Sequence, residues 1–382
     1  MTPPIYLDYN ASTPVAPEVL DVMTRVFRDV HGNALSGHAF GRAAREVVEA
    51  ARAEVAGLIG AMPDEIVFTS GGTESNNAAV AGAAEASAFR GRHLVVSAIE
   101  HASVDLPCRA LEARGWGVAR IPVDANGIVD PLGVASAIRP DTALVSVMHA
   151  NNETGAIQPV AAIARAAKAK GALVHSDAAQ SIGKVGVDVN ELGVDLLSIA
   201  GHKLYAPQGI GALYIRRGTP FAPSQLGAGH QGNRRSGTET VALDAALGAA
   251  CALAARELAS RRAQLQAMRD RLEAALKAGI PGLIVHAGDA KRLPNTLYAA
   301  IPGIDAGELL ARLPGVATGS GAACHSGVTT PSKVLTAMGV KPEIARATLR
   351  LTTGRSTTAE EIDRAAAMIL DAVRSLPAGA RA

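Results

Sequence analysis

The sequence is poor in aromatic residues, in cysteine and in net charge. Aromatic residues make up 3% of its 382 residues, and the formal net charge is +2. It therefore lacks the base-stacking surface and the strong field with which proteins bind nucleic acids or anionic membranes. Its three cysteines, Cys108, Cys251 and Cys324, are too few for a disulfide framework in so long a chain. We therefore expect a cytoplasmic protein, kept reduced, with no nucleic-acid partner.

Long apolar runs are also absent. No run of apolar residues reaches the roughly 18 residues that a membrane span needs. The first residues contain neither the basic nor the apolar region of a signal peptide. We therefore predict no membrane partner, and none of the motifs described below calls for a metal ion.

Short apolar runs do occur between residues 65 and 216, where they alternate with alanine-rich, helix-favouring stretches. This alternation indicates an α/β fold with a mostly parallel sheet covered by helices on both faces. We predict seven strands, at residues 66–69, 94–97, 118–121, 144–147, 173–175, 196–199 and 212–215. Because ligands bind beyond the carboxyl ends of such strands, the polar residues that follow them are candidate site residues.

The second half of the chain predicts a smaller α+β domain. Residues 240–277 are rich in Ala, Leu and Arg and predict one long helix, or two abutting helices, between the domains. Further strands and helices alternate after it, at residues 283–285, 296–298, 306–312, 348–351 and 359–375. We predict a large domain of residues 13–260 and a small domain of residues 1–12 and 261–382, which carries the segment around Cys324.

Asp177 and Lys203 are the most informative pair of residues. Each follows a strand-like run, residues 171–175 and 194–199 respectively. An Asp and a Lys at the carboxyl ends of neighbouring strands can form a pyridoxal 5'-phosphate (PLP) site. The Lys forms a Schiff base with the cofactor, and the Asp keeps the pyridine nitrogen protonated. The pair therefore predicts a PLP enzyme.

Two further motifs suit the phosphate and the ring of such a cofactor. Residues 70–77 follow a strand and open a helix, and Gly72 and Thr73 there can form a phosphate cup at the helix N-terminus. The alternative is an ordinary strand–helix turn. His101 can stack on the ring and move protons, although a lone His is more often a hydrogen-bonded loop residue.

Amide and guanidinium side chains can complete the site. Asn152 and Gln180 can bond a ring oxygen or a substrate carboxylate, and Asn is also a common turn residue. Residues 234–239 can reach a phosphate or form a solvated loop. Arg350 lies in an apolar strand, so a buried guanidinium there needs an anionic partner, either a substrate carboxylate or a structural carboxylate.

Cys324 lies among small and polar residues, at positions 318–327, with a histidine next to it. These residues predict a flexible, exposed loop. A thiol on it can be deprotonated with the help of the histidine, so Cys324 is a candidate nucleophile. Cys108 and Cys251 lie in helix-like sequence and are expected to be buried hydrophobic residues.

Taken together, these motifs resemble the cysteine desulfurase and selenocysteine lyase family of PLP enzymes, in aminotransferase class V. The matching motifs run in order over nearly the whole chain, at residues 6–14, 68–77, 100–101, 151–155, 175–180, 201–203, 237–239, 293–296 and 349–358 and around Cys324. The resemblance implies PLP fold type I, which is aspartate aminotransferase-like.

The resemblance also implies a role for each residue around the ring. Lys203 carries the Schiff base, and Asp177 pairs with the pyridine nitrogen. Gln180 and Asn152 bind the ring oxygen and the substrate. His101 stacks on the ring and helps to move protons.

At the phosphate and the substrate, the resemblance implies five more roles. Thr73 and His202 bind the phosphate. Thr238 binds it from the neighbouring subunit, which implies a homodimer. Arg350 holds the substrate carboxylate, and Cys324 is the catalytic cysteine.

Within the family, the sequence favours the selenocysteine lyase branch. Residues 322–326, Ala-Ala-Cys-His-Ser, resemble the animal lyases, whereas desulfurases usually carry a Ser-Gly-Ser-Ala-Cys-Thr-Ser type of loop. Ala200 also favours the lyase branch, because desulfurases usually have a phosphate-binding Ser at that position. Ala102 does not, because the animal lyases have an Asp there. We predict that the enzyme converts L-selenocysteine to L-alanine and selenide.

Three alternatives stay open. The first is a cysteine desulfurase, which forms L-alanine and a persulfide on Cys324 for a sulfur-acceptor protein; a lyase can likewise pass selenium to an acceptor. The second is another class-V enzyme, an aminotransferase or a kynureninase-like hydrolase, in which the segment around Cys324 has no purpose. The third is a non-catalytic scaffold, which would not need Lys203, Asp177 and Arg350 together.

Overall fold

The computed structural model describes residues 4–320, 322–325 and 328–376, without the side chains of residues 322–325 and 328–331. Its main sheet has seven strands in the order β2-β8-β7-β6-β5-β3-β4. The strands are β2 (Ile66–Thr69), β3 (His93–Ser97), β4 (Gly117–Ile121), β5 (Thr142–Ser146), β6 (Leu173–Asp177), β7 (Leu196–Ala200) and β8 (Gly211–Ile215). β8 runs antiparallel to both of its neighbours, β2 and β7, and the other strand pairs described in this sheet are parallel. The predicted seven-stranded, mostly parallel sheet is therefore confirmed.

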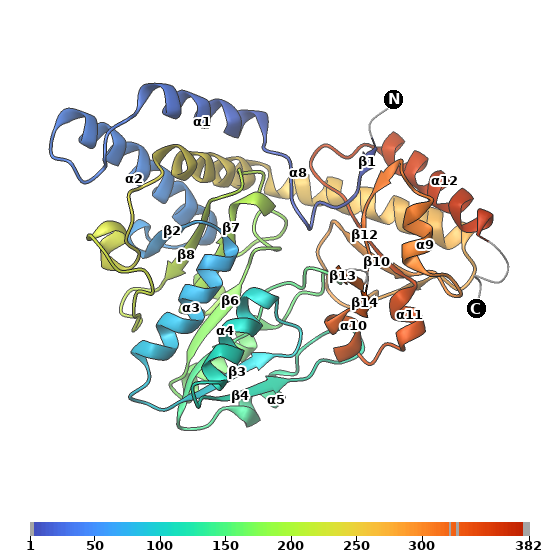
Figure 1. Cartoon of the computed structure of the whole chain (residues 1–382), viewed down its shortest axis with the longest axis horizontal. Helices are drawn as coiled ribbons and strands as arrows, with labels where there is room; N and C mark the ends of the chain where they lie inside the picture. Colours follow the sequence, from blue (N-terminus) through green and yellow to red (C-terminus); the bar gives the residue numbers. More distant parts are fainter. Residues whose placement is uncertain (1–3, 321, 326–327, 377–382) are drawn as a thin grey trace.

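Helices cover both faces of this sheet (Figure 1). Alternate residues of one strand enter different cores: Val95 packs with the first core, and Leu94 and Val96 with the second. This explains why the strands are almost continuously apolar, since both faces are buried. The helices of this part are α1 (Pro17–Asp29), α2 (Ala39–Ile59), α3 (Gly72–Ala86), α4 (Ala102–Glu112), α5 (Pro131–Ala137), α6 (Val160–Ala169) and α7 (Val189–Leu192).

One helix, α8 (Val241–Gly279), joins the two parts of the molecule (Figure 1). Its 39 residues make it about 58 Å long at the ordinary rise of an α-helix. Its first half buries Leu247 in the core beneath the large sheet, and its second half buries Leu272 and Leu276 in a separate core. The predicted long helix is therefore a single one.

The second part of the molecule is built on an antiparallel sheet of order β12-β15-β10-β9. Its strands are β9 (Ile284–Val285), β10 (Thr296–Ala300), β12 (Gly319–Ser320) and β15 (Thr348–Thr352), and its helices are α9 (Ala306–Ala311), α10 (Lys333–Ala337), α11 (Pro342–Arg346) and α12 (Ala359–Ser375). The N-terminal β1 (Ile5–Tyr6) pairs with β11 (Val316–Ala317), so the first residues return to this part. The domain boundaries at residues 12/13 and 260/261 remain a prediction.

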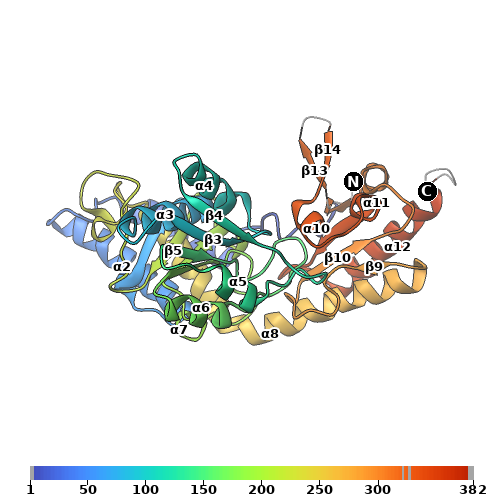
Figure 2. The ribbon, with the colours of Figure 1, turned by 90° about the horizontal axis from the view of Figure 1, so that it is seen from below.

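The segment around Cys324 differs from the predicted flexible loop. Its backbone forms an antiparallel pair of strands, β13 (Ala322–His325) and β14 (Val328–Pro331), with Cys324 opposite Thr329. Figure 2 shows this pair standing out from the second part of the molecule. β14 contains three β-branched residues, which favour an extended backbone. The prediction of a loop considered only the small residues of the segment. The Cys324 side chain lies outside the described atoms.

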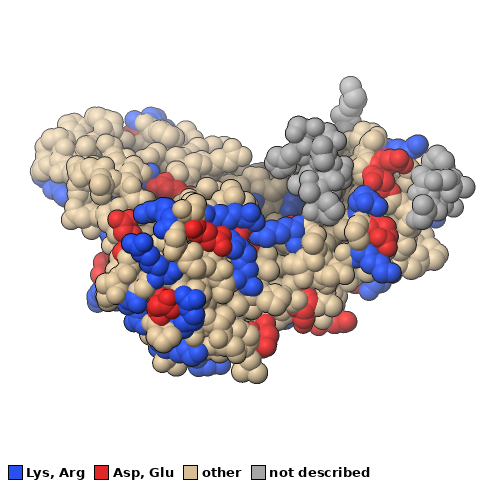
Figure 3. Space-filling model, turned by 60° about the horizontal axis from the view of Figure 1, so that its bottom comes forward, with Lys and Arg blue, Asp and Glu red and all other residues tan. Residues whose placement is uncertain are grey.

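Charges of both signs are intermixed on the face shown in Figure 3. Within the described residues, no helix is both long and apolar enough to cross a membrane.

Candidate active site

A cavity of about 590 Å³ lies at the carboxyl ends of β6 and β7. It collects most of the predicted site residues, which come from both parts of the molecule: Gly72, Thr73, His101, Asn152, Asp177, Gln180, His202, Lys203 and Arg350. Thr238 is exposed and is not among the described residues that line this cavity. Its expected contribution from a neighbouring subunit remains a prediction, as does the place of the Cys324 thiol.

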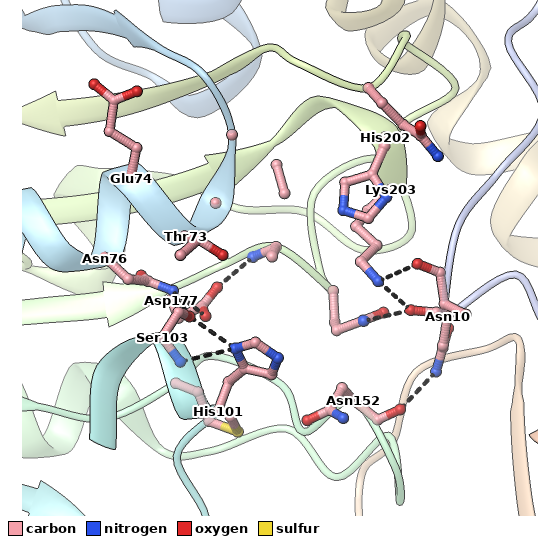
Figure 4. Close-up of a pocket in the computed structure, with 18 of the residues that line it drawn as sticks. Asn10, Thr73, Glu74, Asn76, His101, Ser103, Asn152, Asp177, His202 and Lys203 are labelled. Atoms are coloured by element: carbon pink, nitrogen blue, oxygen red, sulfur yellow. Dashed lines mark hydrogen bonds between the residues drawn. The ribbon is translucent and has the colours of Figure 1, made fainter. Parts of the chain in front are cut away.

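Asp177 is fixed at the end of β6 by two hydrogen bonds. Asn76 Nδ2, from α3, donates to Asp177 Oδ2 at 2.7 Å, and the backbone N–H of Ala179 donates to Oδ1 at 2.9 Å. Asn76 Nδ2 also donates to Ser103 Oγ at 2.8 Å. Figure 4 shows these residues side by side with His101. The carboxylate thus has a defined orientation, while it still lines the cavity.

His101 has a defined tautomer because it caps α4. The backbone N–H of Ser103 donates to His101 Nδ1 at 3.1 Å, and Ser103 Oγ lies 2.7 Å from the same nitrogen. Since a backbone N–H can only donate, Nδ1 is an acceptor and Nε2 carries the proton. Ser103 and Asn76 therefore connect His101 to Asp177. Reasoning from the sequence gave neither residue a role, although Asn76 lies within the motif of residues 70–77 and Ser103 lies two residues after His101.

Lys203 points across the cavity to the N-terminal segment (Figure 4). Its Nζ donates to the carbonyl oxygens of Asn10 and Ala11, at 2.5 and 2.6 Å. Burial, assisted by the positive charge of Arg350, lowers the pKa of the Lys203 amine to about 8. At pH 7 about a tenth of this amine is therefore unprotonated, far more than at the ordinary lysine pKa, which favours a nucleophilic lysine.

The N-terminus of α3 offers a place for an anion. Gly71, the residue before the helix, has a φ of +147° and no side chain to cap the first N–H groups. A Cβ built at Gly71 would meet no atom within 4 Å, so the backbone leaves space at the cavity wall. Thr73 adds a hydroxyl. Free N–H groups and the positive end of the helix favour a phosphate here.

His202 lines the same cavity. Burial and the charge of Lys203 lower the pKa of His202 to about 4, so its ring is neutral. Its Nδ1 lies 3.3 Å from Ser12 Oγ. Ala200 also lines the cavity and supplies a methyl group where a serine would supply a hydroxyl. The phosphate-binding part of the site therefore relies on α3, Thr73 and the neutral His202.

Arg350 reaches the cavity from β15, in the second part of the molecule. Its Nη2 forms an ion pair with Asp8 at 2.7 Å, and its Nη1 donates to the Asn152 carbonyl oxygen at 3.3 Å. Its buried Nε has no partner among the described residues. The sequence allowed two partners for this guanidinium, a structural carboxylate and a substrate carboxylate. The structure supplies the first, Asp8, and leaves Nε without a partner among the described residues.

Asn10 lines the cavity and connects the two parts of the molecule. Its Nδ2 donates to Thr296 Oγ1 at 3.0 Å, and Asn295 Nδ2 donates to its Oδ1 at 3.0 Å. Gln180 Nε2 donates to the Asn10 carbonyl oxygen at 3.0 Å, and Lys184 Nζ bonds its Oδ1. Asn10 belongs to a motif quoted from the sequence, but no local pattern showed its many partners.

These residues fit the predicted PLP. A carboxylate for the pyridine nitrogen, a lysine of lowered pKa, a helix N-terminus for the phosphate and a guanidinium for a carboxylate all line one cavity. The space left open beside Gly71 lies at the end of the cavity that would hold the phosphate. The Asp177 carboxylate and the N-terminus of α3 therefore suit the pyridine nitrogen and the phosphate of such a cofactor.

Comparisons with known proteins agree with this arrangement. A family model described as "Aminotransferase class-V" matches residues 5–365. The chain is 44% identical over 376 residues to "Cysteine desulfurase IscS" of Anaeromyxobacter sp. (strain Fw109-5), covering 98% of this chain and 93% of that protein. It is 41% identical over 376 residues to "Cysteine desulfurase" of Mus musculus, covering 98% and 82%. The solved structure of a NifS-like protein superposes with a TM-score of 0.92 at 34% identity, covering 98% of this chain and 100% of that one.

Proposed function

We propose, from the premise that this chain belongs to the PLP-dependent aminotransferase class-V family, that it is a cysteine desulfurase. It would convert L-cysteine to L-alanine and form a persulfide on Cys324, from which a sulfur-acceptor protein takes the sulfur. The observation that carries the proposal is the convergence of Lys203, Asp177 and Arg350 on one cavity. The names of the relatives support the desulfurase rather than the selenocysteine lyase that the sequence favoured.

The preference for selenocysteine lyase is not confirmed by these comparisons. Residues 322–326, Ala-Ala-Cys-His-Ser, are the observation that keeps it as a second candidate. The two activities share the cavity, the cofactor and alanine as the product, and they differ in the atom that leaves the substrate and in the use of the thiol.

When bound, PLP supplies an electron sink for negative charge on the substrate Cα. Asp177 would hold its pyridine nitrogen, and Asn76 keeps that carboxylate in place. The N-terminus of α3, Thr73 and His202 would hold the phosphate. Each of these groups is on an element of the large sheet or its helices, so the site is assembled on a rigid part of the fold.

Lys203 is the base of the proposed mechanism. Its amine has a pKa of about 8 and can take the proton from the substrate Cα. The carbonyl oxygens of Asn10 and Ala11 hold the amine when it is free.

Arg350 would bind the substrate carboxylate through charge-assisted hydrogen bonds. Asn152 lies against Arg350 through its carbonyl oxygen, so the two residues are placed together. His101 carries its proton on Nε2, at the nitrogen that is not used to cap α4. This proton is available to the reacting part of the substrate.

The sulfur transfer balances without an added oxidant. The Cys324 thiolate attacks the substrate sulfur, so an S–S bond forms as the Cβ–S bond breaks. The carbon keeps the electron pair of the broken bond and takes up a proton to become the alanine methyl group. The two sulfur atoms of the new S–S bond together lose two electrons, and the substrate carbon gains the same two.

The test is alanine release by the PLP-loaded protein, with L-cysteine and L-selenocysteine assayed side by side under anaerobic, reducing conditions. Turnover of cysteine, with a persulfide trapped on Cys324, is the expected result. Rapid turnover of selenocysteine with cysteine acting only as an inhibitor would instead establish the second candidate. Alanine from neither substrate would refute both.

A further inference from the structure

Lys184 is a buried lysine that has no part in the reaction proposed above. It is 6% exposed, and its Nζ donates to Gln180 Oε1 and to Asn10 Oδ1, each at 3.0 Å. Both of these residues line the cavity. The amines of Lys184 and Lys203 therefore share a hydrogen-bond partner, Asn10.

Two backbone carbonyl groups determine which way the neighbouring amide groups face. Asn10 Nδ2 donates to the carbonyl oxygen of Asn152 at 3.2 Å, and Gln180 Nε2 donates to that of Asn10 at 3.0 Å. Because a carbonyl oxygen only accepts, both amide groups must turn their own oxygen atoms toward Lys184. Lys184 is thus the shared donor of two amide groups at the cavity.

A neutral amine suits this position. Burial lowers the pKa of Lys184 well below its ordinary value, and the positive charges of Lys203 and Arg350 lower it further. A neutral amine has two N–H groups, which match the two acceptors found for it in the described structure. An ammonium group would bury a third N–H without an acceptor among the described residues, at a cost in free energy.

Asn10 transmits this arrangement to Lys203. The Asn10 side chain is held by Lys184 and Asn295 at its oxygen and by Thr296 at its nitrogen, and the residue is 1% exposed. Its carbonyl oxygen accepts from Lys203 Nζ and from Gln180 Nε2. The position of the free Lys203 amine and that of the Gln180 amide therefore depend on the same residue.

We propose that Lys184 is a positioning residue for the cofactor site. Its amine binds the oxygen atoms of both amide groups, so it helps to hold Gln180 Nε2 against the Asn10 carbonyl oxygen and to keep that carbonyl oxygen in place for Lys203. The inference rests on the proposed function only in taking this cavity to bind PLP.

The test compares two methionine variants. Lys184→Met removes both N–H groups but keeps an unbranched chain of similar length. Lys170→Met is the matched control, because Lys170 Nζ also donates to two carbonyl oxygens, of Ala135 and Ile138, outside the cavity lining.

In Lys184→Met we expect PLP to bind about tenfold more weakly, because buried amide oxygens lose their donor. Equilibrium dialysis measures this affinity. The pH midpoint of the cofactor's visible absorbance is expected to rise by roughly half a unit, because an N–H donor to the ring oxygen is lost.

A folded Lys184→Met protein with the wild-type affinity and the wild-type absorbance titration would overturn the proposal, as would equal changes in Lys170→Met. If Lys184→Met does not fold, Lys184→Gln takes its place. Its side chain is one bond shorter and cannot reach both amide oxygens, so both readouts should move in the same direction by a smaller amount; no change would overturn the proposal.

Both readouts are taken without substrate. A wild-type protein that binds PLP but releases no alanine would therefore refute the desulfurase function and leave this test intact.

Discussion

Arg350 and Asp8 form an ion pair, with 2.7 Å between Arg350 Nη2 and Asp8 Oδ1, although they lie 342 positions apart in the chain. Both side chains are partly exposed, at 15% and 23%. The guanidinium proposed for the substrate carboxylate is thus already bound to a carboxylate of the protein. A substrate has to displace or share this partner.

The first prediction concerns that competition. Asp8→Asn removes the competing charge, so the KM for L-cysteine should fall about two- to fivefold with little change in kcat, since partly exposed ion pairs are worth about 0.2–1 kcal/mol. Arg350→Gln should raise the KM by about 10- to 100-fold, because charge-assisted hydrogen bonds are worth about 1.5–3 kcal/mol. Steady-state alanine release measures both. A higher KM in Asp8→Asn would show that Asp8 orients Arg350 rather than competing with the substrate.

The second prediction uses the lowered pKa of Lys203, which is about 8. The unprotonated amine is the reactive form, so its fraction grows as the pH rises and is nearly complete above the pKa. The rate at which cofactor-free protein takes up PLP should therefore rise about tenfold per pH unit below pH 8 and level off above it. Visible absorbance records this uptake.

The control for this experiment is a free alkylamine mixed with PLP at each pH, which records the titration of PLP itself. Lys203→Ala should show no such uptake spectrum. A midpoint near the ordinary lysine value would contradict the role given to burial.

The third prediction concerns Glu100, which is 4% exposed behind the cavity. Burial raises the pKa of Glu100 to about 8, although Ser97 Oγ and the backbone N–H of Met148 donate to its Oε1. Between pH 4.5 and 8 the folded state binds more protons at this group than the unfolded state does, so its contribution to stability is lost as the pH rises. The largest slope for one group is about 1.4 kcal/mol per pH unit.

Glu100→Gln is neutral at every pH and should remove this slope, so that the variant is more stable than the wild type at pH 8 but not at pH 5. Urea unfolding at both pH values measures the difference. The exposed Glu46→Gln is the control and should leave the slope unchanged. Equal slopes in Glu100→Gln and wild type would place the Glu100 pKa in its ordinary range.

The fourth prediction distinguishes the cysteines. Cys324→Ala should form no persulfide and should lose L-cysteine turnover by about 100-fold or more, because the nucleophile is gone. Cys108→Ala should keep both, since burial raises the pKa of the Cys108 thiol to about 12 and leaves it unreactive. Mass spectrometry of the loaded protein and alanine release are the measurements.

Alanine formed from L-selenocysteine by Cys324→Ala would favour the second candidate function. Persulfide formation in this variant would show that another residue accepts the sulfur, and would remove Cys324 from the mechanism.

The sequence predicted the large sheet well because its strands are apolar on both faces and are separated by helices. It placed Asp177 and Lys203 at the carboxyl ends of strands for the same reason, since Asp177 is the last residue of β6 and Lys203 comes three residues after the end of β7. It predicted less about residues 318–327, where small residues suggested a loop, whereas the described backbone there includes β12 and β13, the second of which pairs with β14. The place of Thr238 in the site stays a prediction, because the contact expected of it is with a neighbouring subunit.

By itself, the sequence determined the order of the elements and which side chains stand at the ends of the strands, because these depend on local patterns of apolar and polar residues. Only the tertiary structure decided that Asn10 meets Lys184 and Lys203, and that Asp8 meets Arg350. These pairs are distant in the chain. They are brought together by the return of the N-terminal segment between two sheets whose cores both pack on α8.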